Sequence, residues 1–386
     1  MIMRFTGAVA AAVVALGAVV AAQNVPSQFV VSGKAAEQIQ DFTTINLATA
    51  ERIAEACERL AAAENVGISI DVLDNDGNHV YMDRMDGQGY LNIITSEMKA
   101  RTALMQRGSS KLVMNQVRRD GNAELQRIQL GMFPNSGGLP VVINKQMIGV
   151  IGVGGSAPRV PVWSDEICGH KAMQEVLGAA NVAPLVEDVP APPAAAPANP
   201  APVPRFASTT APKTSVSNPE WVVGAKAATT VYDGNQISLA AAKKIAKACR
   251  DFAVAKNGGV SLFILDTFGE LVHVERTDGQ VSNTIRIARL KAETSLKTRV
   301  PTSVYNAQGR NNPAGLVRTI EQFGFFTNAG GLPIVVDGQM IGAIGVGGGA
   351  GGAANGGSDE ACAIEGLKAA FGDHVTLPVY PDPARR

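Results

Sequence analysis

The chain has 386 residues, of which 46% are hydrophobic, and its 34 Lys and Arg residues balance its 34 Asp and Glu residues. A balanced charge, without a basic cluster interleaved with aromatic residues, argues against nucleic acid as a partner. The length leaves room for two domains, each with its own core.

The N-terminus has the pattern of a secretory signal peptide. Arg4 precedes an apolar, Ala- and Val-rich run that ends at Val20, and Ala21-Ala22 provides small residues for cleavage. The run is shorter than the about 20 residues of a comfortable membrane span. We therefore predict a signal peptide over residues 1–22, and a periplasmic or secreted protein with no membrane span after cleavage.

The rest of the chain is a tandem duplication. Residues 47–99 match residues 239–291 at a constant offset of 192, and Gly-Gly-Leu-Pro occurs at both 137–140 and 330–333. Between the copies lies a Pro/Ala-rich stretch, a composition typical of an extended, semi-rigid spacer. We predict domains over 35–183 and 220–380, joined by a linker over 184–219.

The same elements are predicted in both copies, in the same order. Apolar residues spaced by three and four predict a first helix from Leu47. A hairpin, a second helix, a second hairpin and a last helix follow at 68–83, 92–107, 139–153 and from 164, with counterparts at 260–275, 284–299, 333–346 and from 358. Helices combined with antiparallel hairpins indicate an α+β fold. The glycines of the second hairpin are interpreted as turns and close backbone contacts rather than as a phosphate-binding loop.

Each copy contains two cysteines, near its two ends. In an oxidising compartment this arrangement permits the disulfides Cys57–Cys168 and Cys249–Cys362, which would tie the first helix of each copy to its last. Two buried free thiols per copy would fit the sequence equally well.

Five motifs, in one order and in both copies, resemble the GlcG/HbpS family. In the first copy they are Arg-Met-Asp-Gly at 84–87, Lys-Ala-Arg-Thr at 99–102, Gly-Gly-Leu-Pro at 137–140, the glycine-rich 149–155, and Asp-Glu-x-Cys at 165–168. The resemblance implies two tandem profilin-like domains, each a central antiparallel sheet flanked by helices. It also implies haem as a cofactor, because several members bind haem, and assembly into a homo-oligomer.

Haem requires an axial ligand. Tyr81 in the first copy aligns with His273 in the second, and both would project from the same face of a hairpin strand. These two residues are the predicted metal ligands, although half-exposed strand residues are the simpler interpretation. His170 aligns with Ile364 and so is not repeated.

Cations kept in both copies provide candidates for anion binding. Arg84 and Lys99, with Arg276 and Lys291, could hold haem propionates or another carboxylate ligand. In the alternative interpretation Arg84 and Asp86, like Arg276 and Asp278, form a structural ion pair that fixes a turn.

Three functions remain open from the sequence. The first is an exported haem-binding protein for haem or redox sensing or sequestration. The second is an enzyme or binding module for a small carboxylate-bearing ligand at the Arg/Lys pocket. The third is a purely structural building block. No Ser/His/Asp or Cys/His arrangement recurs in both copies, so the sequence designates no catalytic residue.

Overall fold

The computed structural model describes residues 25–39, 43–119, 122–155, 162–190, 216–224, 235–305, 320, 324–349 and 358–378. The predicted signal peptide, and residues 191–215 of the predicted linker, lie outside these ranges. Within them, no helix is both long enough and apolar enough to cross a membrane.

The predicted helices and hairpins are present in both copies. The first copy contains α2 (Leu47–Ala63), β1 (Ser69–Leu73), β2 (His79–Arg84), α3 (Tyr90–Gln106), α4 (Lys111–Arg119), α5 (Asn122–Gln129), β3 (Gly138–Ile143), β4 (Gln146–Gly154) and α6 (Asp165–Leu177), after the short α1 (Gly33–Ile39). The second contains α8 (Leu239–Ala255), β5 (Ser261–Leu265), β6 (Leu271–Arg276), α9 (Ser282–Thr298), β7 (Gly331–Val336), β8 (Gln339–Gly347) and α12 (Asp359–Phe371). The sequence analysis missed α4 and α5.

Side-chain caps explain where the last helix of each copy begins. The Ser164 side chain accepts a hydrogen bond from the Ile167 amide at the start of α6, and Ser358 accepts one from Ala361 at the start of α12. Each cap satisfies an amide that has no partner within the helix, and two acidic residues follow it where the helix dipole favours negative charge.

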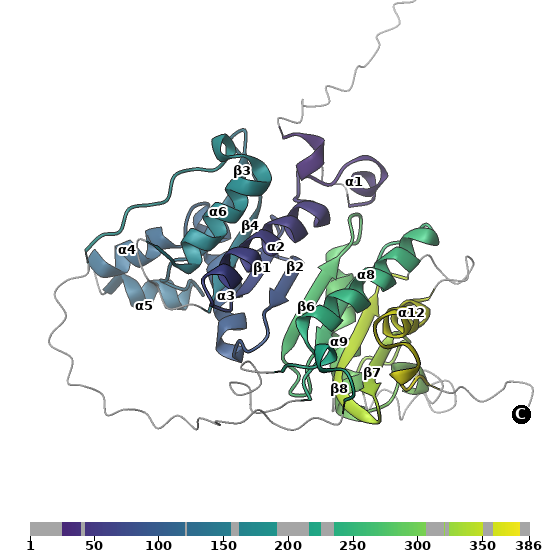
Figure 1. Ribbon diagram of the computed structural model, residues 1–386. Helices are drawn as coiled ribbons and strands as arrows, with labels where there is room; N and C mark the ends of the chain where they lie inside the picture. The colour runs from purple at the N-terminus through teal and green to yellow at the C-terminus, as the bar shows by residue number, and fades with distance from the viewer. Residues whose placement is uncertain are drawn as a thin grey trace, which may run out of the picture.

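The two copies share one antiparallel sheet of eight strands, in the order β3-β4-β1-β2-β6-β5-β8-β7. This arrangement confirms the α+β class, with a four-stranded contribution from each copy. Strands β2 and β6 join the halves, and Met82 is paired with Val274 at the centre of the junction. Figure 1 shows these two strands side by side. Pairing removes two strand edges that would otherwise expose unpaired backbone groups.

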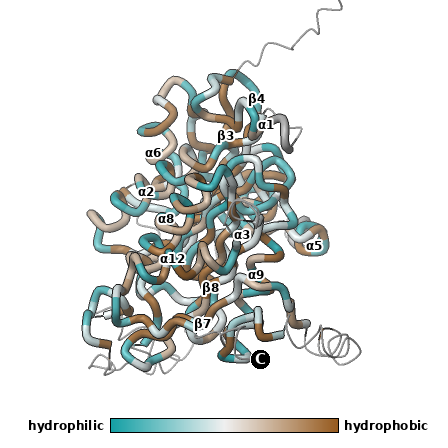
Figure 2. The backbone as a smooth tube through the Cα atoms, turned by 90° about the vertical axis from the view of Figure 1, so that its right-hand side faces the viewer, coloured by the Kyte–Doolittle hydropathy of each residue, from teal (hydrophilic) through white to brown (hydrophobic). Residues whose placement is uncertain are grey.

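Helices cover both faces of the sheet. The pairs α2/α6 and α8/α12 pack on one face, and α3 and α9 pack on the other. Figure 2 shows the hydrophobic colour along β3, β7 and β8, between these layers. At Gly152 and Gly345 a Cβ atom would collide with the backbone of α3 and α9, respectively, which confirms that these glycines allow a close backbone approach.

Both predicted disulfides are present. Cys57–Cys168 joins α2 to α6, and Cys249–Cys362 joins α8 to α12. The four sulfur-bearing side chains are fully buried. Each bridge therefore crosslinks the two helices that cover one face of its own half of the sheet.

Candidate functional site

The two predicted haem ligands lie in contact at the junction of the copies. Tyr81 on β2 and His273 on β6 meet edge to face, with ring centroids 5.2 Å apart. They project from the same face of the sheet, as expected. Both side chains are fully buried rather than half-exposed. No observation of the structure tests their role in ligation.

Both ring nitrogens of His273 already have carboxylate partners. Nδ1 lies 2.5 Å from Asp83 Oδ1, and Nε2 lies 3.0 Å from Glu275 Oε1. Burial alone would lower the pKa of His273, but the neighbouring carboxylates outweigh burial and raise this pKa to about 9. Ligation of a haem iron by His273 would require the ring to leave one of these carboxylates.

Further charges surround this pair and form what we call the junction cluster, which comprises Glu51, Glu58, Tyr81, Asp83, Lys243, Arg250, His273 and Glu275. Lys243 Nζ lies 2.8 Å from both Glu58 and Asp83, and Arg250 lies 2.7 Å from Glu275. Burial, together with the Asp83 carboxylate, raises the pKa of Glu58 to about 9. The cluster connects α2 and α8 to the paired strands β2 and β6.

From the pKa shifts in the junction cluster we predict that the free energy of unfolding falls as the pH rises above 6.5. A group with a higher pKa in the folded protein favours folding below its unfolded pKa, and this contribution is lost as the pH rises through the folded pKa. For His273 this window runs from 6.5 to about 9, and Glu58 shifts in the same direction. We expect the free energy of unfolding to fall by roughly 2 kcal/mol between pH 6.5 and 9, as measured by urea unfolding.

The variant His273→Gln provides the control for this pH dependence. It removes the titrating imidazole and keeps a polar side chain between the two carboxylates, so the slope of stability against pH should become shallower. A wild type that becomes more stable from pH 6.5 to 9 would contradict the assignment.

The repeated Arg-x-Asp-Gly motifs join the two copies. Arg84 Nη2 lies 2.7 Å from Asp266 Oδ2 in the second copy, and Arg276 Nη2 lies 2.5 Å from Asp74 Oδ2 in the first. The ion pair expected within each motif is therefore replaced by an ion pair between copies. The sequence alone does not distinguish these two arrangements, because both require the same residues in each copy.

The acidic residues of the same motifs also act across the junction. Asp86 accepts a hydrogen bond from the Leu239 amide at the start of α8, at 2.9 Å, and Asp278 accepts one from the Leu47 amide at the start of α2, also at 2.9 Å. Each copy thus places a carboxylate at the N-terminus of a helix of the other copy, α8 or α2, where the helix dipole favours an anion.

The lysines that both copies share lie apart from the Arg-x-Asp-Gly motifs. Lys99 Nζ contacts Asp165 Oδ2 at 2.7 Å and the Val153 carbonyl at 2.9 Å, and Lys291 makes the equivalent contacts with Asp359 and Val346 at 2.6 and 2.8 Å. These contacts connect α3 to α6 and β4 in the first copy, and α9 to α12 and β8 in the second. Among the described residues, Lys99 and Arg84 share no contact partner, and neither do Lys291 and Arg276.

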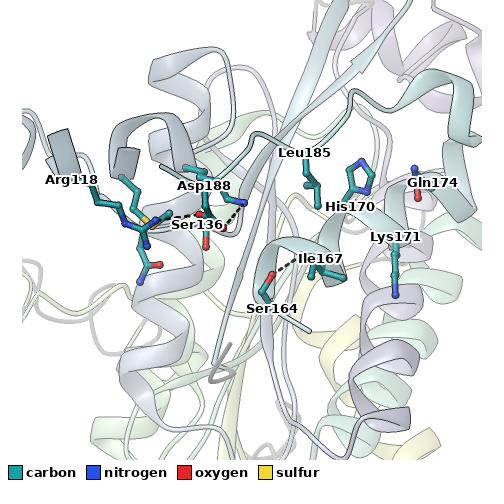
Figure 3. A pocket seen from close by; sticks show the side chains of 12 residues that line it. Arg118, Ser136, Ser164, Ile167, His170, Lys171, Gln174, Leu185 and Asp188 are labelled. Atoms are coloured by element: carbon teal, nitrogen blue, oxygen red, sulfur yellow. Dashed lines mark hydrogen bonds and ion pairs between the residues drawn. The ribbon is translucent and has the colours of Figure 1, made fainter. Parts of the chain in front are cut away.

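A cavity of about 500 Å³ lies in the first copy, between α4, α6 and the segment that follows α6. His170, Lys171 and Ile167 project from α6, and Arg118 and Asp188 lie on the opposite side (Figure 3). The other lining residues are Lys111, Met114, Asn135, Ser136, Ser164, Gln174 and Leu185. The wall thus combines an imidazole, a thioether, apolar side chains and three basic groups.

The segment 185–189, which we call the strap, closes one side of this cavity. Lys111 Nζ donates to the Val186 carbonyl at 3.0 Å, and Asn115 donates to the Glu187 carbonyl at 2.8 Å. Arg118 forms an ion pair with Asp188 at 3.2 Å. The strap belongs to the predicted linker, but these contacts hold it along α4.

His170 on α6 has one ring nitrogen next to a backbone carbonyl. Its Nε2 atom lies 3.0 Å from the Ala183 carbonyl oxygen, so an Nε2–H can donate to that oxygen. Ligating histidines usually donate their second ring N–H in this way, which fixes the tautomer and leaves the other nitrogen basic. His170 is not among the ligands predicted from the sequence, because the second copy has Ile364 in its place.

A family model described as "Haem degrading protein HbpS-like" matches residues 45–174 and 237–368. The chain belongs to this family. Its two matched segments account for both copies and confirm the resemblance seen in the motifs. An uncharacterised 15.0 kDa protein of Citrobacter freundii is 35% identical over 120 residues, which are 30% of this chain and 83% of that protein.

Two further relatives each align with about one copy. Protein GlcG of Escherichia coli K12 is 32% identical over 115 residues, covering 28% of this chain and 80% of GlcG. The solved structure of a double mutant of HbpS from Streptomyces reticuli is 25% identical, covers 36% of this chain and 86% of that chain, and has a TM-score of 0.30.

Proposed function

We propose that the chain binds one haem, in the cavity of the first copy, with His170 as axial ligand. The observation that carries the proposal is the composition of that cavity, in a chain of an HbpS-like family named for haem. A haem site needs an axial ligand, an apolar slot and cations for the propionates. All three are among the lining residues.

Each group in the cavity has a distinct role in this proposal. Ile167 and Leu185 provide apolar contact with the porphyrin. Lys171 and Arg118 provide cations for the propionates, where Arg can bind a carboxylate through two parallel hydrogen bonds. Bound haem would supply a redox-active iron. The protein would use it for haem or redox sensing, or for sequestration.

The sequence of the second copy leads us to expect one haem per chain. At positions equivalent to His170 and Lys171 it has Ile364 and Glu365, so it lacks both the ligand and the cation beside it. One haem per chain therefore follows from a site in the first copy. Ligation by both Tyr81 and His273 would instead place iron at the junction of the copies.

Hemin titration followed by the Soret band tests the proposal. We expect saturation at one hemin per chain, and His170→Ala should weaken binding at least about tenfold or abolish the axial-ligand spectrum. Ile364→Ala, at the equivalent position of the second copy, is the matched control and should bind as the wild type does.

Tyr81→Phe and His273→Ala complete the experiment. Loss of the Soret shift in these variants but not in His170→Ala would move the site to the junction. No shift in the wild type at micromolar hemin would reject haem binding altogether.

The cations kept in both copies are less available to a carboxylate ligand than Lys171, which forms no ion pair among the described residues, whereas Arg118 would also have to leave Asp188. Arg84, Lys99, Arg276 and Lys291 each already contact an Asp carboxylate of the chain itself. A carboxylate ligand at these positions would have to compete with an internal partner.

Export is the remaining part of the proposal. Two buried disulfides are typical of an oxidising compartment, and they support a periplasmic or secreted location. N-terminal sequencing of the protein from its native compartment should find cleavage after Ala22.

A further inference from the structure

A second group of potential metal ligands lies in the first copy, on the sheet face covered by α3. Asp71 on β1, His79 on β2 and Glu97 on α3 each offer one ligand atom, and these atoms lie within 4.8 Å of one another. A shift of register between β1 and β2 pairs His79 with Leu73. Because residues 71 and 73 share one face of β1, this pairing places His79 on the same face as Asp71.

One oxygen of Asp71 lacks a partner. The Asp71 side chain is fully buried, and its Oδ1 lies 2.9 Å from His79 Nδ1. Its Oδ2 is buried and makes no hydrogen bond among the described residues. A buried carboxylate oxygen without a partner is costly. A cation at this position would remove that cost.

The second copy shows that the fold does not require these three residues. At the equivalent positions it has Phe263, Leu271 and Arg289. Phe263 and Leu271 pack in an apolar cluster at the same place in the second half of the sheet. Since hydrophobic residues fill this position, the buried Asp71 and its two neighbours need an explanation other than folding.

The group also adjoins a cavity. About 420 Å³ of space is lined by His79, Glu97 and Arg101 from the first copy, and by residues of β5 and α9 from the second. Glu97 is only partly buried, and its Oε1 accepts a hydrogen bond from Arg101 Nε at 2.8 Å. An ion in this cavity could therefore reach His79 and Glu97, and Asp71 lies directly behind His79, 2.9 Å from its Nδ1 atom.

We infer that Asp71, His79 and Glu97 bind one divalent transition-metal ion, at a site separate from the proposed haem cavity. An imidazole with two carboxylates suits first-row ions such as Co²⁺ and Zn²⁺. The ion takes the place of the proton between His79 Nδ1 and Asp71 Oδ1, and it contacts the unpaired Asp71 oxygen. Glu97 closes the site from the cavity side.

Titration of the chelator-treated, haem-free chain tests this inference. Calorimetry with Zn²⁺, and visible absorption with Co²⁺, should report one ion per chain. His79→Leu should bind at least about tenfold more weakly. Because His79→Leu alone leaves the buried Asp71 carboxylate without its imidazole partner, the double variant Asp71→Phe/His79→Leu is measured beside it. The double variant carries the pair found in the second copy, Phe263 and Leu271, so it should fold and should not bind the ion. Asp71→Asn, which keeps the shape of the side chain, should also weaken binding.

Two controls separate this site from others. Glu293→Gln alters a carboxylate of the second copy that lines the same cavity, and His170→Ala alters the proposed haem ligand. Both should bind the metal as the wild type does. Absence of stoichiometric binding to the wild type, or unchanged affinity in both His79→Leu and Asp71→Asn, would overturn the inference. Either result would leave the hemin titration unaffected.

Discussion

Removal of the first disulfide, in the double variant Cys57→Ala/Cys168→Ala, is expected to lower the free energy of unfolding by about 4–5 kcal/mol. The bridge closes a segment with a sequence separation of 111 residues. A crosslink over so long a segment removes much of the conformational entropy of the unfolded chain. Alanine suits the two buried positions, because it leaves no polar group without a partner.

Urea unfolding, with and without a thiol reductant, measures this effect. The wild type should lose stability when reductant is present during unfolding. The double variant should lose only the part that the second bridge, Cys249–Cys362, contributes. Equal midpoints for the oxidised wild type and the oxidised double variant would contradict a stabilising role for the first bridge.

The elements within each copy could be predicted because their signals are local. Three-and-four spacing from Leu47, and alternation on either side of tight turns, reflect burial of one face of a helix or strand. The helix caps at Ser164 and Ser358 are likewise encoded within a few residues. Each copy has one cysteine near either end, and this position favours one disulfide within each copy over a disulfide between copies.

The junction between the copies could not be predicted, because its contacts link residues far apart in the sequence. Arg84 and Asp86 have equivalents in the second copy. A residue is repeated in this way whether its contacts lie within its own copy or in the other one, so repetition does not reveal the partner. Asp266, the partner of Arg84, lies 182 residues away in the other copy. Strands β2 and β6 pair because each is an edge strand of its own half of the sheet. Which strands lie at an edge is known only once the sheet has formed.

The proposed haem cavity has a weaker signal in the sequence than the junction residues. Repetition gives weight to residues that both copies keep, or that align as two possible ligands. His170 is unique to the first copy, and the strap that encloses it was assigned to the linker. A lone histidine beside Lys171, opposite Ile364 and Glu365 in the other copy, was the available signal.

The variant Arg84→Ala is expected to lower the free energy of unfolding by about 3–5 kcal/mol. The Arg84 side chain is 6% exposed and that of Asp266 is fully buried, so the ion pair is shielded from solvent. Removing one partner leaves the other as a buried charge without compensation. Asp266 Oδ1 keeps its hydrogen bonds from the Phe268 and Glu270 amides, and Oδ2 loses the guanidinium. Urea unfolding at pH 7 measures the loss.

Two comparisons determine whether the cost comes from the broken pair. Arg59→Ala removes a cation whose ion pair with Glu175 is more than half exposed, and such exposed pairs contribute only about 0–1 kcal/mol. The double variant Arg84→Ala/Asp266→Asn removes both buried charges and keeps an Oδ1 acceptor for the Phe268 and Glu270 amides, so it should recover much of the stability lost in Arg84→Ala. If the double variant is as unstable as Arg84→Ala, packing of the arginine stem rather than its charge holds the copies together. Recovery would identify the unpaired carboxylate as the source, because the arginine stem is absent from both variants and only the charge of residue 266 differs between them.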